Sequence, residues 1–198
     1  MYKIGISGKA NSGKNTVSKL IKKQLYNQPA RAQNVHCKYI AFADPIKAMV
    51  RNMFPDLPEK YLTGSSKFRS EIIPGAFKDS SPLTVRQLLI DIGTEMGRKY
   101  KESIWLDAFD AELKRTQSKS FNLIVVADVR FKNEFDHLKN LGFFQIRLLR
   151  DKHSVINHSS ETSQDSIKDE EFDYVLNNNG TLSDLGAEIA KILPLLKV

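Results

Sequence analysis

The sequence predicts an α/β fold in which a parallel sheet is flanked by helices. Apolar runs of strand length alternate along the chain with segments of helical periodicity. The run at 123–127 is apolar at every position, which is typical of a strand covered on both faces. A glycine-containing loop at 8–16 joins the first predicted strand to the first predicted helix. The length of 198 residues agrees with a single domain over 1–198.

The first part of the chain is predicted to form two strand–helix pairs. A strand over 3–7 precedes a helix with four apolar residues on one face: Val17, Leu20, Ile21 and Leu25. A second strand covers 35–42, and the pattern turns helical from Ile46. Four of the seven prolines fall within 54–82, so irregular chain or short helices are predicted there.

The second part of the chain continues the alternation. Residues 83–114 are predicted to be mostly helical, with a break near Gly93 and Gly97. Three strands and one intervening helix are predicted next, with the strands at 123–127, 143–149 and 172–176 and the helix at 133–141. Thr181 and Asp184 have the spacing of a capping box at the start of the last helix.

Composition and charge narrow the classes of function. A hydrophobic fraction of 41% and a charged fraction of 27% argue against a disordered, collagen-like or coiled-coil chain. No apolar run approaches the ~20 residues of a membrane-spanning helix, and the single cysteine, Cys37, fits a reducing, cytoplasmic setting. The formal net charge is +7, and eight basic residues but no acidic one precede Asp44. This excess favours an anionic ligand, either nucleotide phosphates or a nucleic-acid backbone, with charges that only solvate the surface as the alternative.

The loop after the first strand has the spacing G-x-x-x-x-G-K of a phosphate-binding loop. Its residues are Gly8, Lys9, Ala10, Asn11, Ser12, Gly13, Lys14, Asn15 and Thr16. Backbone N–H groups of such a loop converge on phosphate oxygens, and the helix N-terminus adds partial positive charge. Lys14 is expected to reach the β- and γ-phosphates, while the hydroxyl that usually ligates Mg²⁺ comes one position late, at Thr16. An ordinary strand-to-helix turn is the alternative, although the Gly-Lys-x-Thr variant resembles the loop of adenylate kinase and other nucleoside monophosphate kinases.

Two acidic residues are expected at the carboxyl ends of strands, where ligands bind in open parallel sheets. Asp128 ends the apolar strand and is expected to hold Mg²⁺ or orient a substrate, or else only to cap the next helix. Arg130 follows it and is expected to grip a phosphate. Asp44, followed by Lys47, is expected to accept a proton or bind a sugar hydroxyl, or else to serve only the Asp-Pro turn.

Four further residues lie in the predicted helical region. Arg86 and Arg98 are candidates for binding an acceptor phosphate, with Glu95 holding one of them. The alternative is that Glu95 and Arg98 form a solvated pair of little consequence. Trp105 either stacks on a base or belongs to the core, and the core is the favoured interpretation of a lone tryptophan.

Two candidates come from the polar segments near the C-terminal end. Arg150 is the first choice for a mobile arginine that stabilises the charge on a transferred phosphoryl group. The turn at 177–181, which contains Gly180, is predicted to border an adenine or simply to cap the last helix.

The sequence resembles the phage-type deoxynucleoside monophosphate kinases. The resembling segments come in the order found in that family and span almost the whole chain. The matching pieces are 8–16, 42–47, 88–105, 128–134, 158–161 and 173–181. The phosphate loop is generic, whereas Asp-Val-Arg-Phe-x-Asn-Glu together with Gly-Thr-Glu is much more specific. The resemblance implies a P-loop NTPase fold with an acceptor-binding helical region at about 46–115 and a lid at about 150–171.

The resemblance also implies an activity and roles for residues. ATP would give its γ-phosphoryl group to a deoxynucleoside monophosphate with Mg²⁺, yielding the diphosphate and ADP. Lys14 and the loop amides would neutralise the donor phosphates, and Thr16 and Asp128 would place the metal. Arg130 with Arg98 would hold the acceptor phosphate. Further residues implied in binding are Asp44, Lys47, Arg69, Arg86, Glu95, Trp105 and Glu134 for the acceptor and Gly180 for ATP.

Three other functions stay open on the sequence. One is another small-molecule P-loop kinase, such as a kinase of dephospho-coenzyme A. Another is a non-catalytic nucleic-acid binder, against which the lack of an aromatic–basic stacking motif counts. The third is a nucleotide-dependent switch, which the Gly-Lys-x-Thr loop disfavours. We expect a cytoplasmic protein, in the host cytoplasm if a phage encodes it, that forms no stable complex with nucleic acid or membranes. A homodimer is compatible with the sequence.

Overall fold

The protein divides into two compact units, each with its own apolar core. A computed structural model describes residues 1–27, 35–64, 67–117, 119–151 and 163–196. The sheet unit comprises Met1–Ala41 and Phe109–Val198, and the small unit comprises Phe42–Ala108. In the described ranges no helix is long and apolar enough to cross a membrane.

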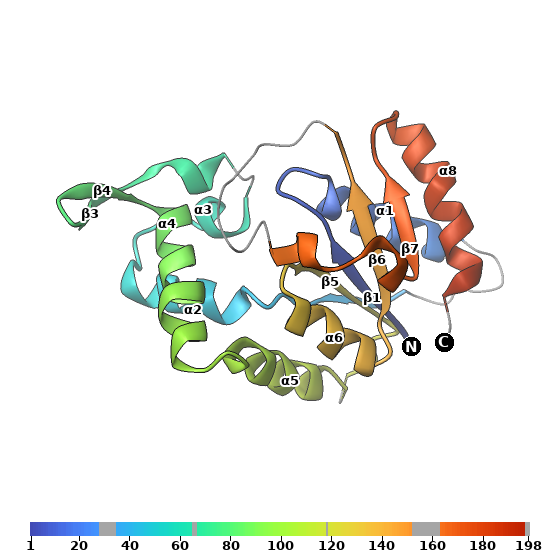
Figure 1. Ribbon diagram of the computed structural model, residues 1–198, viewed down its shortest axis with the longest axis horizontal. Coiled ribbons are helices and arrows are strands. Elements are labelled where there is room, and N and C mark those ends of the chain that lie inside the picture. Colours follow the sequence, from blue (N-terminus) through green and yellow to red (C-terminus); the bar gives the residue numbers. More distant parts are fainter. Residues whose placement is uncertain (28–34, 65–66, 118, 152–162, 197–198) are drawn as a thin grey trace. The chain divides into compact units, whose positions relative to one another are not determined.

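A five-stranded sheet forms the centre of the sheet unit (Figure 1). Its strands are β1 (Tyr2–Ser7), β2 (Cys37–Tyr39), β5 (Leu123–Val129), β6 (Phe144–Leu149) and β7 (Tyr174–Asn177). The strands lie in the order β2-β5-β1-β6-β7, and every neighbouring pair is parallel. The predicted α/β class is therefore confirmed.

The central strand, β1, is the point where the winding of the chain reverses. From β1 the chain builds one side of the sheet with β2 and β5, and it builds the other side with β6 and β7. In open α/β sheets, ligands bind outside the carboxyl ends of the strands at such a switch point. The topology thus places a ligand site at the loop that follows β1.

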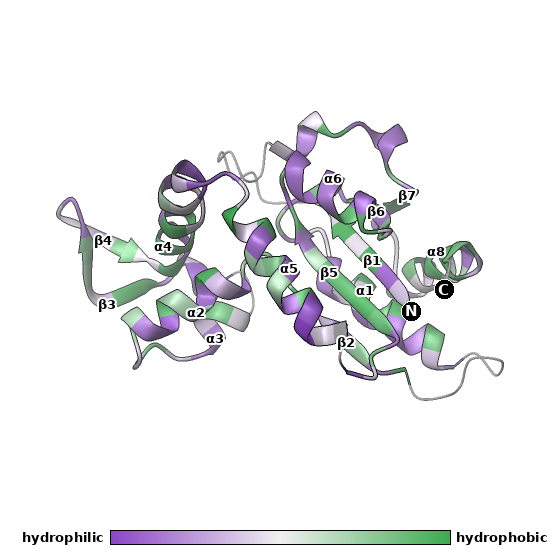
Figure 2. Ribbon diagram, turned by 90° about the horizontal axis from the view of Figure 1, so that it is seen from below, coloured by the Kyte–Doolittle hydropathy of each residue, from purple (hydrophilic) through white to green (hydrophobic). Residues whose placement is uncertain are grey.

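Helices cover both faces of this sheet, as Figure 1 shows. Helices α1 (Lys14–Tyr26) and α8 (Leu182–Ile192) lie on one face, and α6 (Lys132–Asn140) lies on the other. Val17, Ile21 and Leu25 of α1 are buried with the apolar residues of β1. Because both faces of β5 are covered, its first four residues are fully buried, and the strand is coloured hydrophobic over most of its length in Figure 2. Three short 3₁₀ turns complete this unit: η4 (Ser163–Ser166), η5 (Asp169–Glu171) and η6 (Leu193–Leu195).

The small unit is built mainly from short helices around a second core. Its elements are α2 (Asp44–Met53), α3 (Lys60–Thr63), η2 (Phe68–Ser70), β3 (Ile72–Lys78), β4 (Ser81–Thr84), α4 (Val85–Ile90) and the π-helical segment η3 (Asp91–Arg98). Helix α5 (Ile104–Gln117) begins in this unit and continues into the sheet unit. The core of the small unit includes Val50, Leu62, Val85 and Trp105.

The structure corrects two sequence predictions. Strands β3 and β4 form an antiparallel hairpin within 54–82, where only irregular chain or short helices were predicted. Pro74, Gly75 and Pro82 obscure the alternation of a strand, and a register shift interrupts the pairing. The hairpin turn at Asp79 and Ser80 has positive φ at both residues, 49° and 66°, which suits the twist of the strands. Strand β2 covers only Cys37–Tyr39 of the predicted 35–42, so Asp44 begins helix α2 rather than ending a strand.

The predicted break near Gly93 and Gly97 is a stretch of π-helix that contains both glycines. The indole of Trp105 explains the wider turn. A Cβ on Gly97 would come within 2.3 Å of the indole, and the indole Nε1–H donates to Gly93 O at 2.7 Å. The helix therefore widens where a large side chain packs directly against its backbone.

Candidate active site

The predicted phosphate loop lies at the switch point, between the end of β1 and the start of α1. Gly8 lies so close to β6 that a Cβ would come within 2.7 Å of Leu148 O. Gly13 has φ +104° directly before the first residue of α1, a conformation that other residues rarely adopt. Both glycines of the motif are therefore required by the backbone, as the phosphate-loop interpretation predicts.

Lys14 reaches back across this loop. Its Nζ donates to Gly8 O at 2.5 Å and to Lys9 O at 2.8 Å. No acidic residue lies in the first turn of α1, so the partial positive charge of the helix N-terminus is not offset there. Thr16 is exposed in the same turn, and its backbone N–H donates to Gly13 O at 2.9 Å. The loop thus combines an ammonium group, a hydroxyl and a helix N-terminus.

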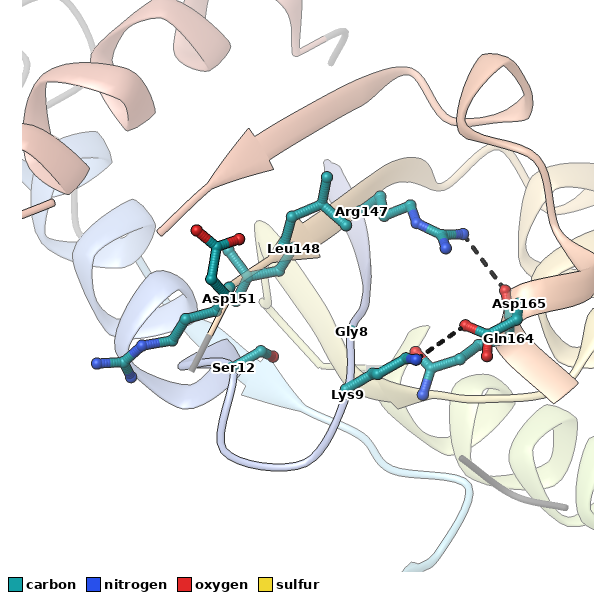
Figure 3. Close-up of a pocket in the computed structure, with 10 residues that line it drawn as sticks. Gly8, Lys9, Ser12, Arg147, Leu148, Asp151, Gln164 and Asp165 are labelled. Carbon is teal, nitrogen blue, oxygen red and sulfur yellow. Dashed lines mark hydrogen bonds and ion pairs between the residues drawn. The ribbon is translucent and has the colours of Figure 1, made fainter. Parts of the chain in front are cut away.

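A pocket of about 280 Å³ opens beside the loop (Figure 3). It is lined by Gly8, Lys9, Ser12, Arg147, Leu148, Leu149, Arg150, Asp151, Gln164 and Asp165. Lys9 forms an ion pair with Asp165 at 3.3 Å. Arg147 has a structural role, because it donates a hydrogen bond to Ile167 O at 2.7 Å and forms an ion pair with Asp169 at 2.8 Å. Three cationic side chains therefore line a pocket that adjoins the phosphate loop.

Arg150 contacts the loop directly. Its Nη1 donates to Asn11 O at 3.3 Å, which brings the predicted mobile arginine to the same place as the predicted phosphate site. The next residue, Asp151, is fixed by Asn179, whose amide group accepts from Asp151 N at 2.8 Å and donates to Asp151 Oδ2 at 2.7 Å. The segment 152–162, which holds half of the predicted lid and the whole piece 158–161, lies outside the described residues.

Asp128 lies near the end of β5, next to the end of β1. Gly5 pairs with Val126 whereas Ser7 pairs with Val129, so β5 has one residue more than β1 over this stretch. Such a bulge redirects side chains and is frequent near active sites. Asp128 is half-buried. The strand order thus brings it to the same edge of the sheet as the phosphate loop.

Glu134 caps helix α6, a structural role that differs from the acceptor binding predicted for it. Only 3% of it is exposed. Its Oε2 accepts hydrogen bonds from Arg130 N at 2.8 Å and from Phe131 N at 3.1 Å, and so caps α6. Arg130 O in turn accepts from Ser163 Oγ at 3.1 Å. The backbone of Arg130 is therefore held from two sides.

The remaining acceptor-side candidates belong to the small unit. Asp44 starts α2 and pairs with Lys47 at 3.4 Å. Arg69 lies in η2, Arg86 in α4, and Glu95 and Arg98 in η3. Glu95 is exposed, whereas the three arginines are half-buried. The structure distributes these residues over four elements of one unit.

Trp105 is a core residue, and a stacking role for it is not supported. It is 3% exposed and packs among the apolar residues of the small unit. The indole leaves no open face for a base, because its ring lies against Gly97 and its N–H is used by Gly93 O.

Gly180 lies in the turn before α8, as predicted from the capping box. The hydroxyl of Thr181 accepts from Asp184 N at 3.2 Å, and Asp184 Oδ2 accepts from Thr181 N at 2.8 Å. The hydrogen bonds that the Asp184 carboxylate accepts from the backbone N–H and the hydroxyl of Thr181 lower the pKa of Asp184. A Cβ on Gly180 would come within 2.7 Å of Asp184 Oδ2, so the missing side chain is explained by the cap.

Several residues near the loop were not singled out from the sequence. Gln164 is buried, and Ser7 Oγ donates to Gln164 Oε1 at 3.3 Å. Asn178 Nδ2 donates to Ser12 O at 2.7 Å. In the sequence, Asn178 stood out only as part of an asparagine-rich turn, and nothing pointed to Gln164. The hydrogen-bond partner of each residue lies more than 150 positions away along the chain, so no local pattern connects them.

The described residues contain no group of three or more metal-binding His, Cys, Asp or Glu side chains. Mg²⁺ in phosphoryl-transfer sites is commonly held by one or two carboxylates together with substrate phosphates and waters. The pair of Thr16 and Asp128 fits that pattern.

Comparison with known proteins agrees with this geometry. The sequence model of the family "Deoxynucleotide monophosphate kinase" matches residues 58–189, about two thirds of the chain. The chain belongs to this family. The matched range begins after the phosphate loop, so the family assignment and the loop geometry are independent observations.

Two individual proteins are similar to this chain, the first in sequence and the second in fold. A protein of Acanthamoeba polyphaga mimivirus, named "Putative deoxynucleotide monophosphate kinase", is 28% identical over 202 residues, which cover 96% of this chain and 94% of that protein. The crystal structure of TT1252 from Thermus thermophilus matches with a TM-score of 0.50 and 16% identity, over 100% of both chains. The second similarity concerns the fold alone.

Proposed function

We propose that the protein transfers the γ-phosphoryl group of ATP to a deoxynucleoside monophosphate, giving the deoxynucleoside diphosphate and ADP. The family supports the acceptor class. The observation that carries the donor side is the phosphate loop at the switch point of the sheet, with Lys14 across it and Arg150 beside it. A triphosphate is the ligand that best matches this concentration of positive charge.

On the donor side, the loop amides and Lys14 bind the phosphates. Lys14 Nζ donates hydrogen bonds to the carbonyl oxygens of Gly8 and Lys9. When ATP binds, Lys14 exchanges these partners for β- and γ-phosphate oxygens. The N-terminus of α1 adds its partial positive charge at the same place, which favours binding of the same anion. Gly180, in the turn near the loop, is proposed to border the nucleoside part of ATP.

Mg²⁺ would be held by Thr16 and Asp128. When bound there, Mg²⁺ would supply positive charge that offsets the negative charge developing on the phosphates during transfer. Thr16 presents a hydroxyl in the first turn of α1, and Asp128 presents a carboxylate at the adjacent strand end.

On the acceptor side, Arg130 is proposed to bind the monophosphate, and Arg98 is the further candidate for this role. A phosphate oxygen of the acceptor attacks the γ-phosphorus, and the bond from that phosphorus to the oxygen shared with the β-phosphate breaks. Most of the catalytic task is to hold two anions in line against their repulsion. Arg150 is proposed to stabilise the transferred group. Asp44, Lys47, Arg69, Arg86 and Glu95 are proposed to position the rest of the acceptor.

The test is a panel of deoxy- and ribonucleoside monophosphates, together with dephospho-coenzyme A, each incubated with ATP and Mg²⁺. Diphosphate formation is followed by chromatography and by ³¹P NMR. We expect at least one deoxynucleoside diphosphate and an equal amount of ADP, with turnover lost when the metal is chelated. Phosphorylation of dephospho-coenzyme A alone, or of no member of the panel, would overturn the proposal.

Lys14→Ala tests the donor site. Removing one charged group that stabilises developing phosphate charge lowers turnover by about 10²–10³-fold. Lys19→Ala is the matched control, because Lys19 lies on the same helix with an exposed side chain and should leave turnover unchanged. Near-normal turnover in Lys14→Ala would remove Lys14 from the mechanism.

A further inference from the structure

Asn178 connects the last strand of the sheet to the phosphate loop. It follows β7 directly, and its backbone N–H donates to Leu149 O at 2.8 Å, which continues the pairing of β7 with β6 by one step. The position of Asn178 is thus set by the sheet. Its side chain is half-buried, and its Nδ2 donates to Ser12 O at 2.7 Å, across 166 positions of the chain.

The side chain of Asn178 also occupies the space beside Gly13. A Cβ on Gly13 would come within 2.5 Å of Asn178 Nδ2. The second glycine of the phosphate motif is therefore required twice, by its φ of +104° and by the amide that lies against it.

A hydrogen bond to Ser12 O has a consequence for the next N–H group. The peptide unit is planar and trans, so the carbonyl oxygen of Ser12 and the N–H of Gly13 point in opposite directions. Holding Ser12 O on Asn178 fixes the Gly13 N–H on the side away from Asn178. Glycine has access to conformations in which this peptide unit is flipped, so the loop sequence alone does not select the orientation.

We propose that Asn178 is a positioning residue that orients the Ser12–Gly13 peptide so that the Gly13 N–H is presented to the donor phosphates. Asn178 does not touch the phosphates in this role. It acts through the loop, by removing a conformational freedom that phosphate binding would otherwise have to remove. The identity of the phosphate donor as ATP rests on the proposed function, whereas the orientation of the peptide does not.

The test compares Asn178→Ala and Asn178→Asp with the wild-type chain. Binding of a non-hydrolysable ATP analogue with Mg²⁺, and of inorganic tripolyphosphate, is measured by titration calorimetry. We expect Asn178→Ala to weaken both by about fivefold, the effect of one net hydrogen bond. Asn178→Asp keeps the shape but replaces the donor by a carboxylate oxygen facing Ser12 O. The two oxygens repel each other and favour the flipped peptide, so this variant should weaken binding further. A role in packing alone predicts the opposite order, with the isosteric variant closer to wild type.

Asn140→Ala is the matched control. It removes the same amide group from an exposed asparagine at the end of α6, outside the phosphate loop and the pocket. We expect its affinity for the analogue to stay within twofold of wild type. The KM for the monophosphate should stay unchanged in Asn178→Ala while the KM for ATP rises. An equal rise in both values would overturn the proposal.

A readout without nucleotide separates this inference from the proposed function. Hydrogen exchange of the amides at 9–16 in the free protein should be faster in Asn178→Ala than in wild type and Asn140→Ala. If the wild-type chain phosphorylates nothing, the proposed function fails while the exchange result still decides the role of Asn178. If exchange and tripolyphosphate affinity are both unchanged, the role of Asn178 is refuted even in an active kinase. Should Asn178→Ala fail to fold, Asn178→Asp carries both measurements.

Discussion

Glu134 accepts a hydrogen bond from the backbone N–H of Arg130 at 2.8 Å while being almost completely buried. The same oxygen accepts from Phe131 N, so one carboxylate satisfies two donors at the start of α6. This cap fixes the backbone of Arg130, the residue proposed to bind the acceptor phosphate. The Asp-Val-Arg-Phe-x-Asn-Glu piece therefore combines a strand-end arginine with the residue that holds it.

Replacing Glu134 should reduce stability and acceptor binding together. Glu134→Ala leaves two partly buried N–H groups without this acceptor and removes a buried side chain, so it should lower the free energy of unfolding by about 2–3 kcal/mol. Glu134→Gln keeps an acceptor oxygen and should cost about 1 kcal/mol. Urea unfolding measures both, and the KM for the monophosphate should rise more than the KM for ATP. Asp136→Ala, which removes only an exposed pair with Lys132, should cost less than about 1 kcal/mol. A cost in Glu134→Ala no larger than in Asp136→Ala would contradict the capping role.

Gly97 should not tolerate a methyl group. The Cβ of Gly97→Ala would come within 2.3 Å of the Trp105 ring and 2.9 Å of Ile92 O, so we expect a loss of about 1–3 kcal/mol. Gly186→Ala in α8 is the control with the opposite sign. Its Cβ meets nothing closer than 3.7 Å, so the higher helix propensity of alanine should stabilise the protein by about 0.5–1 kcal/mol. Unfolding is followed by circular dichroism and by the fluorescence of Trp105, the single tryptophan. Equal stability of Gly97→Ala and wild type would contradict the packing described for Trp105.

Tyr39 should make the protein less stable at alkaline pH. Burial, together with the charge and the hydrogen bond of Cys37, raises the pKa of Tyr39 from 10.0 to about 12. Between these values the unfolded chain loses the phenol proton before the folded chain does, so stability is full below pH 10 and falls as the pH rises towards 12. Tyr39 is 43% exposed, so solvent screening reduces the size of the effect.

Tyr39→Phe should therefore show a weaker decline of the urea midpoint between pH 9.5 and 11 than wild type. Cys37→Ala should weaken the decline in part, because Cys37 contributes to the shift. Parallel pH profiles for all three proteins would contradict this assignment.

Local signals in the sequence predicted the elements that depend on short-range physics. The apolar run of β5, the amphipathic face of α1 and the Thr181–Asp184 cap each follow from residues within a few positions of one another, and all three are confirmed. The β3–β4 hairpin was missed because two prolines and a glycine replace the alternating pattern that identifies a strand. The π-helical segment was predicted only as a break, since its cause is the indole of Trp105 packed against it.

The phosphate loop and the α/β class of the fold were determined by the sequence itself. Glycine spacing and hydrophobic periodicity are properties of contiguous residues, and they carry over directly into backbone conformation. Tertiary structure alone decided that Trp105 packs against Gly97, that Glu134 caps α6 and that Asn178 holds Ser12 O. Each of these roles depends on which side chains the sheet and the helices bring together, and burial and hydrogen-bond partners across the chain leave no periodic trace in the sequence.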